Sequence, residues 1–209
     1  MNRRQFIQHA GAFGAAAALG LPSVARADEA APKPMPMIRI GSLAVSRLIL
    51  GSNQYGGWAH RPGDAGKEML AWYTDERVLA ELDEAAALGI NCVSIPPSDR
   101  WHRLWKTHKE KGGKMAFWIA QPAAAPDQMP ADIEAAVKNG AKAVETIRQL
   151  EKPVIAYKIL GAGRVGPKEG FDFALKNIRP KDGVCVGVWG KEGAGQLKED
   201  AEMMKTMGG

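Results

Sequence analysis

Short apolar runs alternate with stretches of helical periodicity along most of this chain. The apolar runs have the length of β-strands and are bounded by Gly, Pro or polar residues; they lie at residues 47–50, 90–97, 115–122, 153–160 and 184–189. Between most of them, apolar residues recur three and four positions apart, which is the spacing of one helix face. Strands that alternate with helices predict a parallel β-sheet, so we expect an α/β fold with about five core strands.

The first predicted helices have clear end signals. Thr74 is a good N-cap for a helix that Gly89 ends, and Ser98 can cap a second helix at residues 99–112. The second helix carries an apolar stripe that we interpret as core packing rather than a ligand platform: Trp101, Leu104, Trp105 and His108. We further predict a hairpin at residues 38–46 and a long Gly-rich loop at residues 51–69. Four later helices are predicted at residues 130–140, 141–152, 167–178 and 195–207.

Residues 1–27 follow a different pattern. Arg3 and Arg4 are adjacent in a basic start, an Ala- and Gly-rich stretch follows, and residues 25–27 form a small-x-small cleavage site. This segment resembles a twin-arginine export signal rather than an ordinary N-terminal helix. The resemblance implies export by the twin-arginine machinery to the periplasm. Because that pathway carries folded proteins, often with a cofactor already inserted, a bound cofactor is a reasonable expectation.

The predicted cleavage divides the chain into a signal peptide at residues 1–27, a Pro-rich linker at residues 28–37 and one domain at residues 38–209. The signal peptide holds three of the 28 Lys and Arg residues and none of the 23 Asp and Glu residues, so the rest of the chain has a net charge of +2. No basic block with interleaved aromatic residues marks a nucleic-acid groove. We therefore expect a small-molecule ligand and no nucleic acid.

The two cysteines lie inside apolar runs. We interpret Cys92 and Cys185 as buried thiols rather than as a disulfide or a catalytic pair. Neither belongs to a C-x-x-C pair, and neither has a histidine at metal-ligand spacing. The sequence therefore predicts no metal site.

A glycine motif follows the fourth apolar run. Gly161, Gly163 and Gly166 match the G-x-G-x-x-G spacing of dinucleotide-binding turns. A Rossmann unit places this motif near its start and an acidic residue at the end of the next strand. Here the motif lies near the C-terminus, and Asp182 comes before the next strand instead of after it. We therefore reject a Rossmann site.

Sequence alone leaves two arrangements for the parallel sheet, an open doubly wound sheet and a closed (β/α) barrel. In barrels, the loops after the last two strands often hold phosphate groups. Gly161, Gly163, Arg164 and Lys191 lie in the corresponding loops here, where glycines let backbone amides approach an anion. The alternative is that these loops are simply tight turns.

Three polar residues near the ends of predicted strands are candidate catalytic residues. Asn53 and His60 lie in the loop after the first core strand, and Lys158 lies near the end of the fourth. The carboxyl ends of barrel strands meet on one face, where sites are built. Lys158 could form a Schiff base or bind a substrate carboxylate, or it could pair with a nearby acid. His60 could equally be a solvated loop residue.

Two parts of the chain resemble the aldo-keto reductase family of barrels. Residues 43–58 (LAVSRLILGSNQYGGW) and 83–100 resemble its first units, and residues 182–204 resemble its last strand and cofactor loop. The resemblance implies a TIM-barrel-like (β/α) fold and carbonyl reduction with NADP(H), and it places Gly187, Lys191 and Gln196 nearest to the cofactor. Asp200 stands where the family usually has Asn, and Ser94 and Asp99 stand in place of its catalytic Asp and Tyr.

The chain more closely resembles exported barrel proteins of uncharacterised function that share its "GGWAH" loop and an ending like residues 152–177. Those proteins have further βα units where the predicted helices at residues 130–140 and 141–152 abut here. We therefore expect an incomplete TIM-barrel-like architecture, shortened in the middle or completed by a second copy. The expected function is NADP(H)-linked carbonyl or sugar oxidoreduction; the alternatives are a non-catalytic binder of a small anionic or sugar ligand, and an inactive remnant.

Overall fold

The computed structural model describes residues 33–121 and 140–209. The predicted signal peptide, the first part of the predicted linker and nearly all of the predicted helix at residues 130–140 lie outside the described residues. Strands β1 (Met37–Ile40) and β2 (Leu43–Ser46) form an antiparallel hairpin whose turn is at residues 41–42, as predicted.

Five parallel strands form the central sheet in the order β5-β4-β3-β7-β6. Their bounds are Leu48–Leu50 for β3, Cys92–Ile95 for β4, Phe117–Ala120 for β5, Ile155–Tyr157 for β6 and Gly183–Val186 for β7. The prediction of a parallel α/β sheet with about five core strands is confirmed. Among the described residues, β5 and β6 are edge strands that do not pair with each other, so the sheet is open and no closed barrel is seen.

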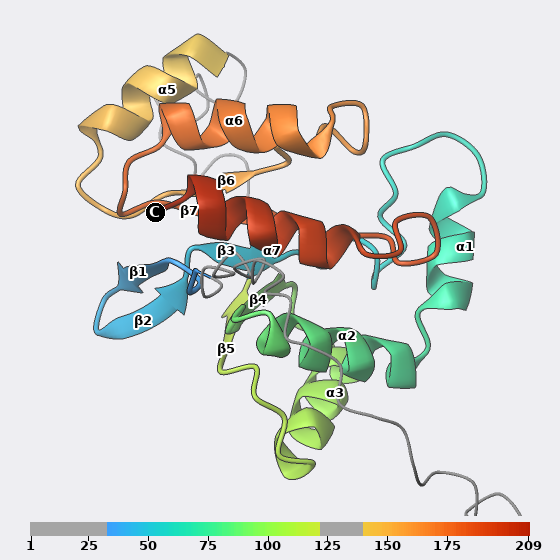
Figure 1. Ribbon diagram of the computed structural model, residues 1–209. Coiled ribbons are helices and arrows are strands. Elements are labelled where there is room, and N and C mark those ends of the chain that lie inside the picture. Colours follow the sequence, from blue (N-terminus) through green and yellow to red (C-terminus); the bar gives the residue numbers. More distant parts are fainter. Residues whose placement is uncertain (1–32, 122–139) are drawn as a thin grey trace, which may run out of the picture. The chain divides into compact units, whose positions relative to one another are not determined.

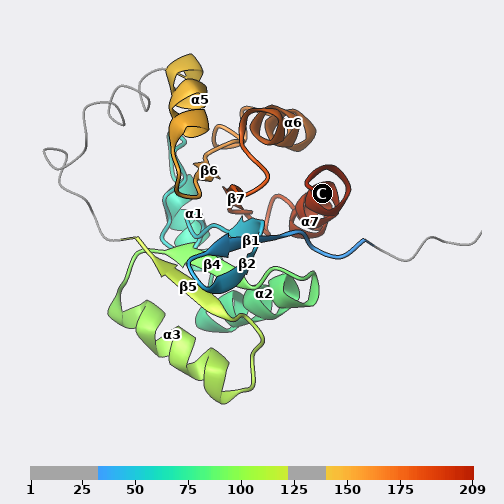
Figure 2. The same cartoon turned by 90° about the vertical axis from the view of Figure 1, so that its left-hand side faces the viewer.

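Helices cover one face of this sheet. The connections from β3 to β4, from β4 to β5 and from β6 to β7 each move one place across the sheet in the same direction, and right-handed crossovers then place their helices on one face. Figure 2 shows these helices outside the strands. The helices that pack on this face are α2 (Asp75–Ala87), α3 (Asp99–Glu110), α6 (Pro167–Asn177) and α7 (Gln196–Met207), whereas α5 (Gly140–Gln149) precedes β6.

The side chains of the strands alternate between two apolar clusters, as the two-residue period of a strand requires. Leu48, Leu50 and Val184 pack in the large cluster with the helices. Ile49 points to the other face, where it lies in a smaller cluster with both cysteines and with Ile38 of the hairpin. The hairpin thus covers part of the sheet face that the helices leave open.

The prediction that both cysteines are buried free thiols is confirmed. Cys92 on β4 and Cys185 on β7 are buried, and burial raises the pKa of each thiol to about 12. Strand β3 lies between β4 and β7, and two strand spacings are about 9–10 Å. That separation exceeds the reach of a disulfide, for which Cα atoms lie at most about 7 Å apart.

Helix α1 (Ala65–Trp72) begins inside the predicted Gly-rich loop at residues 51–69, so that prediction is wrong for residues 65–69. The helix packs closely on the preceding loop. A Cβ atom at Gly66 would lie 2.4 Å from the carbonyl oxygen of Gly57, so a side chain has no room there. The two glycines therefore allow the backbone of the helix to approach the backbone of the loop. In the sequence, these glycines look like part of a Gly-rich loop.

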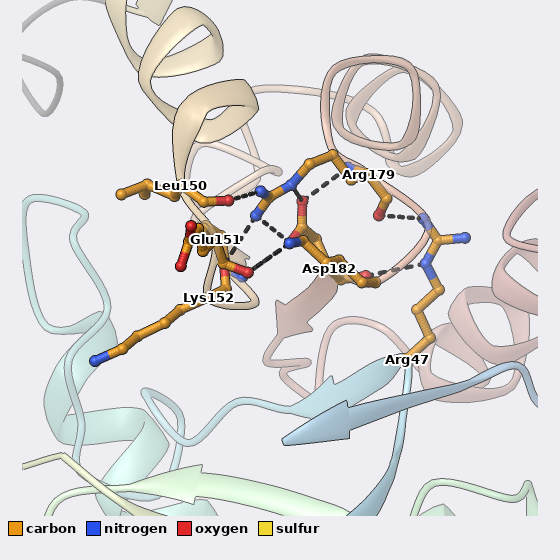
Figure 3. A network of polar contacts seen from close by, with 8 residues as sticks. Arg47, Leu150, Glu151, Lys152, Arg179 and Asp182 are labelled. Carbon is orange, nitrogen blue, oxygen red and sulfur yellow. Dashed lines mark hydrogen bonds and ion pairs between the residues drawn. The ribbon is translucent and has the colours of Figure 1, made fainter. Parts of the chain in front are cut away.

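A polar network ties the loops at the amino ends of the strands, shown in Figure 3. The Asp182 carboxylate is fully buried, and it accepts hydrogen bonds from Arg179 Nη2 at 2.8 Å and from the backbone N–H of Val154 at 2.9 Å. Arg47 Nε donates to the carbonyl oxygen of Asp182 at 3.0 Å. Burial alone would raise the pKa of Asp182, but the bonds from Arg179 and Val154 lower it below its ordinary value. This network joins the loops that precede β3, β6 and β7, at the amino ends of these strands.

Candidate functional site

The loops after β3, β6 and β7 come together at the carboxyl ends of the strands, on the α1 side of Figure 1. They enclose a cavity of about 640 Å³ lined by residues of the segments 51–61, 157–167 and 185–196, with Met69 of α1. The carboxyl edge is where ligands bind in open α/β sheets and in barrels.

The cavity gathers almost all of the residues that the sequence analysis selects. Eight of them line it: Asn53, His60, Lys158, Gly161, Gly163, Arg164, Gly187 and Gln196. Lys191 does not line it, because its Nζ atom bonds the Glu68 carboxylate of α1 at 2.9 Å. Lys191 is expected in the site because helix α1 is not predicted from the sequence. This helix carries Glu68, the acid that binds Lys191.

Left-handed backbone is concentrated around this cavity. His60, Lys158 and Ala162 have φ values of 50°, 61° and 59°, and they are the non-glycine residues with positive φ in the described part of the chain. All three line the cavity. A left-handed conformation costs an L-residue about 1–2 kcal/mol, and such strain tends to occur at functional sites.

The glycine turn uses its own amides. Gly161 donates its N–H to the carbonyl oxygen of Lys158 at 3.0 Å, and Gly163 donates to that of Leu160 at 2.9 Å. These amides therefore do not point at a ligand, and the tight-turn alternative fits both glycines. The side chains of Lys158 and Arg164 in this loop can contact an anion.

The charged residues of the cavity wall leave an excess of positive charge. Arg61, Lys158 and Arg164 face a single acid, Glu192, whose carboxylate pairs with Arg61 at 2.8 Å. Arg164 donates from Nη2 to the carbonyl oxygen of His60 at 3.3 Å, which joins the two loops. Lys158 is exposed and forms no ion pair with a described residue; its Nζ lies 5.8 Å from the ring centroid of Tyr157.

Tyr157, the last residue of β6, is a site residue that the sequence analysis misses. Its hydroxyl donates to Asn53 Oδ1 at 3.0 Å, so it fixes the side chain of a predicted residue. Burial raises the pKa of Tyr157, and the nearby Cys185 adds to this, while the bond to Asn53 lowers it. The phenol stays protonated at neutral pH. The two-residue period of β6 places Tyr157 on the same sheet face as Ile155, which is the signal that could have found it.

A half-buried carboxylate holds Gln54, a residue of the cavity wall. Glu81 of α2 accepts hydrogen bonds from Gln54 Nε2 at 3.1 Å and from the hydroxyls of Tyr55 and Tyr73 at 2.8 Å each. Burial raises the pKa of Glu81, although these donors lower it. Glu81 lies three residues after Val78, within the buried stripe of its helix, and that position is the sequence signal for its role.

The residues expected near NADP(H) make contacts within the protein. Gln196 donates its amide to Asp200 Oδ1 at 2.7 Å, and Lys191 is held by α1. A Cβ atom at Gly187 would lie 2.5 Å from Gln54 Oε1, so protein packing already accounts for this glycine. We therefore derive no step through a nicotinamide.

The positions of the family's acid groups do not form a catalytic pair either. Ser94 is buried on β4 and accepts a hydrogen bond from Gln121 Nε2 at 2.7 Å. Asp99 is the first residue of α3 and does not line the cavity. Within residues 33–121 and 140–209, no three His, Cys, Asp or Glu side chains are grouped as metal ligands.

Comparison with known proteins identifies one feature. The TAT (twin-arginine translocation) pathway signal sequence matches residues 1–20. The chain therefore carries a twin-arginine export signal, and the prediction of that signal is confirmed. No curated protein and no solved structure matches the chain. In the part of the chain that the structure describes, no helix is long and apolar enough to cross a membrane.

Proposed function

We propose that this exported α/β protein binds a small anionic organic molecule in the cavity at the carboxyl ends of β3, β6 and β7. The observation that carries the proposal is the position of Lys158. It combines a left-handed backbone, exposure at the cavity wall and the absence of an ion-pair partner among the described residues. A strained, unpaired cation at a cavity is well suited to bind an anionic group.

The rest of the wall supports an organic ligand rather than a bare ion. Apolar surface surrounds the basic residues and comes from Trp58, Met69, Leu160, Val188 and Trp189. Small-molecule sites are mostly apolar, with a few polar groups that orient the ligand. Arg164 stands on the same turn as Lys158, so two cations can approach one anionic group.

The same proposal extends to the fold and the location of the protein. We propose that the domain is an incomplete TIM-barrel-like one, because the first and last core strands, β3 and β7, are neighbours and the connections β3–β4, β4–β5 and β6–β7 step the same way. We also propose the periplasm as its location, in keeping with the export signal. Association of copies stays a prediction, which light scattering on the purified protein checks.

Calorimetric titration of residues 28–209 tests the binding proposal, with glucose 6-phosphate and NADPH as probes. Lys158→Gln removes the cation and keeps a polar side chain of similar length. A hydrogen bond to a charged group contributes about 1.5–3 kcal/mol, so affinity should fall about 10- to 100-fold. Lys168→Gln is the matched control, because Lys168 is an exposed lysine of α6 outside the cavity wall. Equal affinities for the wild type and the Lys158 variant would contradict the proposal.

A further inference from the structure

A second hollow adjoins the cavity at the carboxyl ends of β4 and β5. Its volume is about 590 Å³. The two hollows share a wall formed by Asn53, Trp58, Ala59, His60, Arg61, Tyr157 and Lys158. The second one extends from this wall to residues that do not line the first: Gly57, Gly63, Gly66, Pro96 and Gln121.

The chemistry of the second hollow differs from that of the first. Its own five residues are all uncharged, whereas the first hollow adds Arg164, Glu192 and the turn at residues 161–166 to the shared wall. Trp58, on the shared wall, is 45% exposed and offers an apolar surface. The site is thus charged toward β6 and β7 and neutral toward β4 and β5.

Two amides with oriented side chains supply hydrogen-bonding groups in the second hollow. Gln121 donates its Nε2 to Ser94 Oγ, so the network orients its amide, and its Oε1 atom bonds no described residue. Asn53 accepts from Tyr157 at Oδ1, and its Nδ2 atom likewise bonds no described residue. One acceptor, held by buried Ser94, and one donor, held by exposed Tyr157, match the needs of a ligand hydroxyl, which donates and accepts.

We propose that the two hollows are subsites of one elongated site, and that its ligand is a sugar bearing one anionic group. The anionic group lies by Lys158 and Arg164, and the hydroxyl-bearing ring lies by Gln121, Asn53 and Trp58. This inference rests on the proposed function, since it takes the cationic hollow as an anion site. It adds the class of the ligand and the residues that select it.

Calorimetric titration of residues 28–209 with three probes tests the inference: glucose 6-phosphate, glucuronate and inorganic phosphate. The wild type should bind the phosphorylated sugar at least about tenfold more tightly than inorganic phosphate, and the glucuronate titration distinguishes a carboxylate from a phosphate as the anionic group. Gln121→Ala should weaken binding of the sugar about tenfold and leave that of inorganic phosphate unchanged. Gln149→Ala, an exposed glutamine of α5 outside both hollows, is the matched control and should change neither.

Two contrary results have different meanings. Equal affinity of the wild type for both sugars and for inorganic phosphate, or an unchanged sugar affinity in Gln121→Ala, would overturn the second subsite and keep the anion site. Loss of all three affinities in Lys158→Gln agrees with both proposals, whereas no binding of any probe by the wild type overturns both. Thermal unfolding of each variant shows that it is folded, and Trp58→Ala gives a second test of the same subsite.

Discussion

Asp200→Asn should stabilise this protein at neutral and alkaline pH. Asp200 is 1% exposed on α7; Gln196 bonds one of its carboxyl oxygens, and the other has no partner among the described residues. Burial, the main cause, raises its pKa to about 7 from an ordinary 3.8, and Glu199 adds to this. The protonated carboxyl is therefore the form that suits the folded protein.

The sign of the pH dependence follows from this shift. Because the folded state holds the proton more tightly than the unfolded state, the stability from this group is complete below about pH 4 and is lost as the pH rises through about 7. At 1.36 kcal/mol per pH unit, the loss is at most about 4 kcal/mol, of which about 3 kcal/mol falls between pH 5 and pH 8. Asparagine has the same shape and does not ionise.

Urea unfolding followed by tryptophan fluorescence measures the effect at pH 5 and pH 8. We expect Asp200→Asn to exceed the wild type by about 2–4 kcal/mol at pH 8 and by clearly less at pH 5. Glu202→Gln removes a negative charge from the exposed face of the same helix and serves as the control. The reasoning is refuted if the asparagine variant shows the same stability as the wild type at pH 8, or the same gain at both pH values.

The remaining predictions concern the amino edge of the sheet, the glycine turn and the thiols. Asp182→Asn should lower the free energy of unfolding by about 1–3 kcal/mol in urea titrations, because it removes the buried charge that accepts hydrogen bonds from Arg179 and Val154; an unchanged stability would contradict this. Ala162→Gly should keep or raise stability by up to about 1 kcal/mol, since its φ is positive, whereas Ala143→Gly inside α5 should lower it by about 1 kcal/mol, and equal effects would contradict the strain. Cys92 and Cys185 should react with a thiol reagent only in denaturant, and fast reaction of the folded protein would show that they are accessible.

Much of the fold is readable from local pattern. The strands follow from apolar runs, and the caps of α2 and α3 follow from Thr74 and Ser98, whose side chains accept the backbone N–H of Arg77 and Trp101. These signals act within a few residues, so sequence reveals them. Helix α1 is missed because its one glycine, Gly66, serves a contact with Gly57 of the preceding loop, which the local pattern does not show.

The sequence predicts where the candidate site lies better than it predicts which contacts its side chains make. The order of the strands brings Asn53, His60 and Lys158 to one edge of the sheet, as strand polarity predicts. The role expected for Lys191 is changed by a tertiary partner, Glu68, that no spacing indicates, whereas Gln196 bonds Asp200 four residues later on the same helix. Position along the chain therefore predicts which loops meet, and packing decides which side chains remain available.

The most direct test of the central claim is an NMR titration of ¹⁵N-labelled residues 28–209 with glucose 6-phosphate. If the cavity at the carboxyl edge binds an anionic ligand, saturable shifts should appear at the amides of His60, Lys158 and Arg164 and should be absent at the amino edge around Asp182. Shifts confined to other parts of the chain, or none at millimolar ligand, would contradict the account.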